Sequence, residues 1–208
     1  MAKRTDPVYS TVVLEFTAAA NEFCKYAEHA SELKGDELLK ILQRLLPYLY
    51  LKASLLPLLE PVFEEGNVKS VTESDWTQVH DTLKSVFGSA NDFNEVFDEK
   101  AKDSEGPVVS SLAENMADIY QDLKNFLVLY RTGTNEVMND AVWECRLNFE
   151  HYWGQLLTNS LRAIHYFIYS GEETLPDHSV DHNHPRERDT SEWFISRRQK
   201  DYRENGKQ

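Results

Sequence analysis

Residues 135–169 read NEVMNDAVWECRLNFEHYWGQLLTNSLRAIHYFIY and contain the longest uninterrupted helical pattern in the sequence. Apolar residues from Met138 to Phe167 recur at spacings of three, four and seven, which places them on one face of an α-helix. A second apolar stripe begins at Trp153, so the apolar face widens toward the end of the segment. The pattern predicts one helix on the order of 50 Å long. We expect a bend, or the close approach of another helix, at Gly154.

The segments before this one also have helical periodicity. Asp6-Pro7 starts a pattern that ends near residue 31, with Asp6 as the N-cap. A leucine-rich segment follows over 38–59. Because a proline inside a helix removes a hydrogen bond, we expect a kink or break at Pro47. This segment is apolar nearly all round, so we expect it to be mostly buried.

Two further helices are predicted at 72–87 and 108–130. The second is joined to 135–169 by a short connection, so the two should form an antiparallel hairpin. No alternation of apolar and polar residues is strong enough to predict a strand. The fold class that follows is an all-α bundle of about five to seven helices, with 135–169 as its long central helix and a C-terminal tail.

Composition limits the kind of protein that this chain forms. With 208 residues and 41% hydrophobic residues, we expect one helical domain at 1–171, followed by a polar linker and tail at 172–208. The net charge of −13 disfavours nucleic acid and anionic membranes as partners. No window resembles a membrane span or a signal peptide, so a cytoplasmic location is predicted. Cys24 and Cys145 lie in helical patterns and are interpreted as buried free thiols.

An acidic motif supplies one catalytic hypothesis. Asp92, Glu95 and Asp98 have the spacing D-x-x-E-x-x-D, which on a helix would bring their carboxylates to one face as ligands for Mg²⁺. A helical nucleotide hydrolase needs a second acidic group on a facing helix. The next helix offers only carboxylates at i, i+4 and i+8, namely Glu114, Asp118 and Asp122. The competing interpretation, a solvated acidic face, is the more frequent origin of such runs.

Two groups of histidines and basic residues were also considered as sites. His178, His182 and His184 have a spacing that neutral imidazoles use for Zn²⁺, but they lie between two prolines without a neighbouring cysteine. On the long helix the polar residues near the apolar face are Arg146, His151, Arg162 and His165. They would line a pocket for an anionic ligand or, more commonly, lie at the edge of the core. No metal site and no cofactor are predicted.

The C-terminal tail combines aromatic and basic side chains. These are the residue types enriched at binding hot spots, and they are Trp193, Phe194, Arg197, Arg198 and Tyr202. From Arg186 onward the balance of charge is +2, opposite in sign to the rest of the chain. Three interpretations compete: the tail docks on the acidic body, it binds a partner, or it is a disordered end with a few aromatic residues. Because aromatic side chains are costly to leave in water, we expect docking on the body first and a partner second.

Two sequence segments carry a family resemblance. PYLYLKASLLP at 47–57 and WGQLL at 153–157 are similar to a group of small all-helical proteins of unknown function from Bacteroidetes. The resemblance covers about the first 170 residues. It implies an intracellular bacterial helical domain and supplies no catalytic residue to transfer to this chain.

The sequence therefore leaves two functions from different classes. The first is a non-enzymatic protein that mediates protein–protein interaction through its acidic surface or its tail. The alternative is a metal-dependent nucleotide hydrolase that uses Asp92, Glu95 and Asp98. The oligomeric state stays open, because the surplus apolar face of the leucine-rich segment suits a core or a dimer interface equally well.

Overall fold

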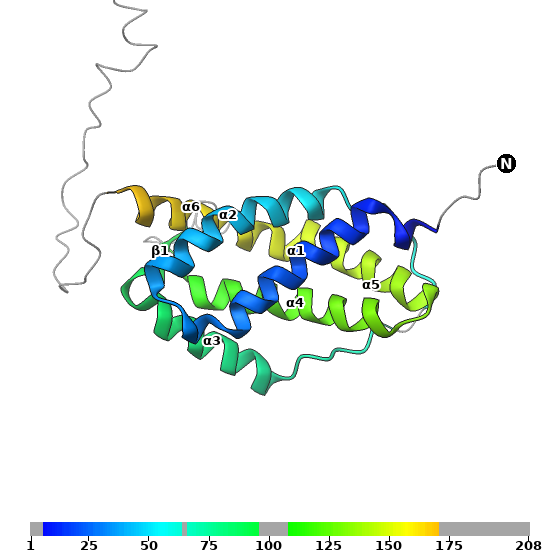
Figure 1. Ribbon diagram of the computed structural model, residues 1–208, viewed down its shortest axis with the longest axis horizontal. Helices are drawn as coiled ribbons and strands as arrows, with labels where there is room; N and C mark the ends of the chain where they lie inside the picture. Colours follow the sequence, from blue (N-terminus) through cyan, green and yellow to red (C-terminus); the bar gives the residue numbers. More distant parts are fainter. Residues whose placement is uncertain (1–5, 64–65, 96–107, 171–208) are drawn as a thin grey trace, which may run out of the picture. The chain divides into compact units, whose positions relative to one another are not determined.

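The computed structural model describes residues 6–63, 66–95 and 108–170 (Figure 1). Its helices in chain order are α1 (Thr11–Glu28), α2 (Gly35–Ser54), α3 (Glu73–Phe87), α4 (Leu112–Thr132), α5 (Asn135–Asn148) and α6 (Gly154–Tyr169). Shorter elements are the turns η1 (Pro7–Tyr9), η2 (Ala30–Glu32) and η3 (Gly88–Ala90), the π-helical turn η5 (Phe149–Trp153), and the strands β1 (Asp92–Asn94) and β2 (Val109–Ser111). The predicted all-α bundle is confirmed.

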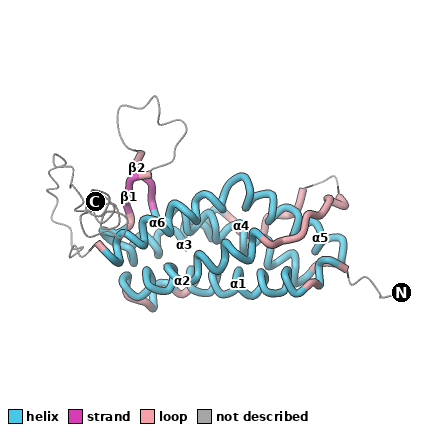
Figure 2. Tube along the Cα trace, turned by 90° about the horizontal axis from the view of Figure 1, so that it is seen from above, coloured by secondary structure: helices cyan, strands magenta, loops and turns pink. Residues whose placement is uncertain are grey.

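The inner helix of the bundle is α4, which packs against α1, α3, α5 and α6 (Figures 1 and 2). The helix α2 packs against α1 and α6. The core between these helices is one cluster that includes Phe16, Phe23, Leu123 and Trp153, each at most 1% exposed. The predicted hairpin of α4 and α5 is present, and the helix predicted over 135–169 forms its second arm.

That second arm is not one regular helix. Its first part, α5, ends at Asn148, and the π turn η5 widens the helix before α6 begins at Gly154. A Cβ atom at Gly154 would lie 2.4 Å from the Phe149 carbonyl oxygen. The close approach expected at Gly154 therefore exists, but Phe149 of the same segment makes it. The sequence pattern continues through the π turn because the apolar face stays on one side.

Two expectations for the leucine-rich segment differ from the structure. Of the kink or break expected at Pro47, a break is excluded, because the helix α2 continues through that residue. Pro47 is exposed, so water is available to the backbone carbonyl that loses its donor there. The segment is also less buried than expected, since Tyr48, Leu51 and Leu55 are 45%, 52% and 53% exposed. Its buried stripe is the other face, which contains Leu42, Leu46 and Leu49.

Local sequence signals fix the ends of α3. Thr72 and Asp75 form a capping box, in which the Thr72 hydroxyl accepts from the Asp75 amide and the Asp75 carboxylate accepts from the Thr72 amide. At the other end Gly88 has a φ of 52°, a conformation that favours glycine. Both ends lie where the sequence placed them.

A small antiparallel sheet lies at one end of the bundle (Figure 2). Strand β1 pairs with β2 in the register Asp92↔Ser111 and Asn94↔Val109. The expectation that the chain contains no strand was therefore wrong. Each strand has three residues, which is too short for an alternating pattern, and the pairing brings together two segments that are separated in sequence.

No helix among residues 6–63, 66–95 and 108–170 is long and apolar enough to cross a bilayer.

Candidate functional site

The acidic motif of the catalytic hypothesis does not lie on a helix. Asp92 is the first residue of β1, and its carboxylate accepts a hydrogen bond of 2.7 Å from the Asn91 side chain. Glu95 follows the strand and accepts from the Asn159 amide of α6. Asp98 lies outside the described residues. The helical geometry assumed for Asp92 and Glu95 was therefore wrong, because the backbone pairs with β2 there.

The second acidic group joins helices. The carboxylate of Asp118 accepts from the Trp76 indole on α3, at 2.9 Å, and from the Tyr152 hydroxyl in η5. Burial and the bond to Asp118 raise the pKa of Tyr152 well above its usual value. One turn along α4, Asp122 accepts from the Asn148 side chain of α5 at 2.8 Å. Within the described part of the chain, no three histidine, cysteine or acidic side chains form a group that could hold a metal ion.

The polar residues proposed for the long helix do not converge on one site. Arg146 donates to Glu150 at 2.8 Å and to the Leu56 carbonyl. Arg162 donates to the Asn94 carbonyl of β1 at 2.6 Å, so it contacts a different segment from Arg146. His151 and His165 are both exposed. The histidines at 178, 182 and 184 and the tail residues from Trp193 to Tyr202 lie outside the described residues, and their roles stay predictions.

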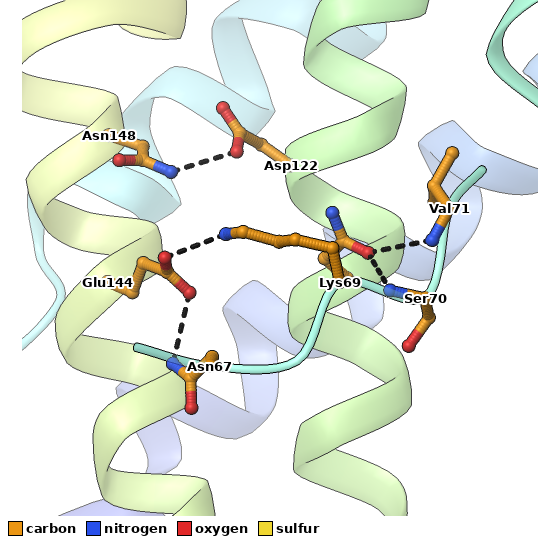
Figure 3. A network of polar contacts seen from close by, with 8 residues as sticks. Asn67, Lys69, Ser70, Val71, Asp122, Glu144 and Asn148 are labelled. Carbon is orange, nitrogen blue, oxygen red and sulfur yellow. Dashed lines mark hydrogen bonds and ion pairs between the residues drawn. The ribbon is translucent and has the colours of Figure 1, made fainter. Parts of the chain in front are cut away.

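A polar network holds the connection between α2 and α3 against α4 and α5 (Figure 3). Glu144 on α5 accepts from Lys69 at 2.7 Å and from Asn67 at 3.0 Å. The Asn125 side chain on α4 accepts from the amides of Ser70 and Val71, at 2.7 and 3.0 Å. Each of these carboxylate and amide groups has a bonded partner, so the network anchors a loop across two helices.

An opening with a mainly apolar lining lies between α1 and α4. This α1/α4 groove is a cavity of about 500 Å³ that is open to solvent on one side. From α1 it is lined by Leu14, Thr17, Ala18, Asn21, Cys24 and Lys25, and Glu28 closes one end. From α4 it is lined by Lys124, Leu127, Val128, Tyr130 and Arg131. Leu14 is 51% exposed, so a large apolar side chain faces water here.

Local geometry explains why the groove is hollow. On α1 the lining residues follow the helical spacing beside the buried stripe, and Thr17, Ala18 and Asn21 are too short to fill the space above α4. The Tyr130 hydroxyl is turned toward the N-terminus, where it donates to the Val8 carbonyl at 2.6 Å. As a result, the short side chains of Thr17, Ala18 and Asn21 do not fill the space between α1 and α4.

The charged residues of the groove lie at its rim. Lys124 and Glu28 form an ion pair of 2.5 Å, and the Tyr120 hydroxyl donates to the same carboxylate. Burial of Cys24 raises the pKa of its thiol far above the usual value, so the neutral thiol is present at physiological pH and is not a nucleophile. The Cys24 thiol therefore adds a small apolar surface to the lining of the groove.

Sequence reasoning missed this groove. Its α1 stripe is next to the buried stripe of that helix, which includes Val13, Phe16 and Ala20, and the small residues at 17, 18 and 21 were a readable signal. Its α4 wall begins about a hundred residues later, and nothing in either periodicity says that the two stripes meet.

Comparisons with known proteins agree with the architecture. A family model described as a domain of unknown function (DUF5063) matches residues 7–170. The crystal structure of protein BF1032 from Bacteroides fragilis, a structural-genomics target, is 33% identical to this chain, with a TM-score of 0.71. The similarity covers 84% of this chain and 99% of that one. A comparison with curated proteins found no match.

Proposed function

The chain belongs to the DUF5063 family, a domain of unknown function, and we propose that it mediates protein–protein interaction through the α1/α4 groove. The observation that carries this proposal is the groove itself, a cavity of about 500 Å³ between two helices that has a mainly apolar lining and is open to solvent. Apolar depressions of this kind are where binding partners gain most from removing surface from water. The tail, with Trp193 and Phe194, is a second proposed contact.

The lining supports binding over catalysis. Leu14, Leu127 and Val128 supply apolar surface, and the charged groups stand at the edges. Binding surfaces commonly have this arrangement, an apolar centre with a polar rim.

The test compares two full-length variants that each place a carboxylate on an exposed leucine. Leu14→Asp introduces charge into the groove, and Leu58→Asp, at an 82% exposed position outside it, is the matched control. A partner recovered from lysate with the wild type is purified and titrated against all three proteins. We expect wild type and Leu58→Asp to bind equally and Leu14→Asp to bind at least about tenfold more weakly.

The same titration locates the contact. In a methyl-labelled sample, the resonances of Leu14, Leu127 and Val128 should shift on addition of the partner, and that of Leu58 should not. Equal binding by Leu14→Asp, with no shift of the groove methyls, contradicts the proposal. A further variant, Trp193→Ala with Phe194→Ala in the full chain, tests the tail in the same assay.

A further inference from the structure

We propose that the occupant of the α1/α4 groove is a short amphipathic α-helix of a partner protein, with acidic side chains along its edge. This inference rests on the proposed function and deepens it, because it gives the shape and the charge of the partner segment. Three observations lead to it: the position of α3, the spacing of the lining residues and the charge of the rim.

The first observation is that a helix already lies at one end of the groove. Glu28 and Tyr120 line a smaller cavity together with Asp75, Gln78 and Val79 of α3, and Glu28 also closes the α1/α4 groove. The helix α3 therefore packs beside α1 and α4 at the point where the groove begins. In Figure 1 it covers only one end of this side of the bundle. The residues that line the groove come from α1 and α4 and not from α3, so a partner helix would lie on these two helices.

The second observation is the geometry of the two walls. On α1 the lining residues Leu14, Ala18, Asn21 and Lys25 are spaced by four, three and four. On α4, Lys124, Leu127 and Arg131 are spaced by three and four, which is also the spacing of one helix face. Walls made by two straight helical stripes accept the ridge of a third helix, which is how helices pack in bundles. Leu14 to Lys25 spans about 16 Å, enough for a helix of about three turns.

The third observation is the charge of the rim, which is opposite to that of the molecule. Lys25, Lys124 and Arg131 face one carboxylate, Glu28, which gives the lining a net charge of +2 in a chain of −13. Lys124 is paired with Glu28, and Lys25 forms a longer ion pair of 3.8 Å with Glu22. No ion pair joins Arg131 to another residue that the structure describes.

These charges select the partner segment. An acidic helix is repelled by the net negative charge of the chain and attracted by the cationic lining of the groove, so its charge favours this site. A basic helix would be attracted by the net negative charge of the chain and repelled by the cationic lining of the groove. Apolar residues at i, i+3 or i+4 and i+7 would contact Leu14, Leu127 and Val128, while Asp or Glu on the flanks would reach Lys25 and Arg131.

The experiment selects peptides from a displayed library of helix-forming sequences of about 12 residues, which matches the length of the groove. The full-length wild type is the target, and Leu14→Asp is used for counter-selection. We expect the enriched peptides to share a helical apolar stripe flanked by Asp or Glu. Their affinity is then measured by fluorescence anisotropy against wild type, against Lys25→Glu with Arg131→Glu, and against Lys40→Glu with Lys84→Glu as a matched charge control away from the groove.

The charge reversal in the groove should weaken binding about tenfold or more, and the same reversal at Lys40 and Lys84 should weaken it much less. Enriched peptides without acidic bias, or with an extended pattern, would overturn the acidic-helix proposal and leave groove binding intact. If no peptide is enriched in a way that depends on Leu14, that result contradicts both proposals. Circular dichroism of the variants confirms that each is folded.

Discussion

At the scale of single residues, several aspartate carboxylates join elements of the fold by accepting hydrogen bonds. Asp118 and Asp122 join α4 to neighbouring elements, and Asp140 on α5 accepts from the amides of Val62 and Phe63 at 2.7 and 2.9 Å. Burial opposes ionisation of Asp140, but the bonds from these two amides and from Asn139 outweigh it, so its pKa is lowered. At Asp122 burial prevails over the bond from Asn148, and the pKa is raised.

This contrast makes a prediction for Asp140→Asn. One of the two backbone amides would face an amino group, so we expect a loss of about 2 kcal/mol in the free energy of unfolding at pH 7. A lowered folded pKa gives stability that is present above the ordinary value of 3.8 and is lost as the pH falls through the folded value. The difference between wild type and variant should therefore shrink at acid pH in denaturant titrations.

Asp122→Asn is the control, with the opposite sign. The raised pKa of Asp122 means that its ionised form is disfavoured in the folded state, and asparagine keeps an oxygen for Asn148. We expect no loss of stability at pH 7. A large loss in this variant, or a pH-independent loss in Asp140→Asn, would contradict the assignment of the two charges.

At the scale of elements, the π turn depends on Gly154. Its φ of −62° is ordinary for a helix, so glycine is needed there for space and not for backbone freedom. A Cβ atom would also lie 2.9 Å from the Phe149 ring, which packs against Tyr50 and Trp153.

We predict that Gly154→Ala destabilises the protein by about 2 kcal/mol because the Phe149 carbonyl and ring must move. For a chain of this size the melting temperature should fall by roughly 4–8 °C. Gly66→Ala is the matched control, since no atom lies within 4 Å of the added carbon. Equal melting temperatures for the two variants would show that η5 relaxes into a regular helix without penalty.

At the scale of the whole molecule, the charge of −13 is not arranged as a metal site in the described structure. Asp92, Glu95, Asp118 and Asp122 each accept hydrogen bonds from side chains of the protein. The lining of the α1/α4 groove, with Lys25, Lys124 and Arg131 against Glu28, has a net charge opposite in sign to that of the chain.

For this reason we predict that Mg²⁺ or Mn²⁺ with nucleotides leaves the melting temperature of the full chain unchanged. A ligand that binds only the folded state must raise it by mass action. The control is each metal alone and each nucleotide with chelator. A rise that requires both metal and nucleotide, and that Asp92→Asn with Glu95→Gln abolishes, would restore the hydrolase hypothesis.

The sequence alone determined the fold class, the helix at 72–87, most of the helix at 108–130 and the family resemblance. The start of the second helix was placed too early, because residues 109–111 form β2. Helical spacing and capping residues act within a few turns, so they are readable without knowing the neighbours. The tertiary structure decided the rest. The continuity of α2 through Pro47 depends on which face meets water, and the β1–β2 pair depends on two separated segments meeting. The α1/α4 groove exists because short side chains on α1 lie over α4. Periodicity tells which residues share a face, but packing decides what each face meets.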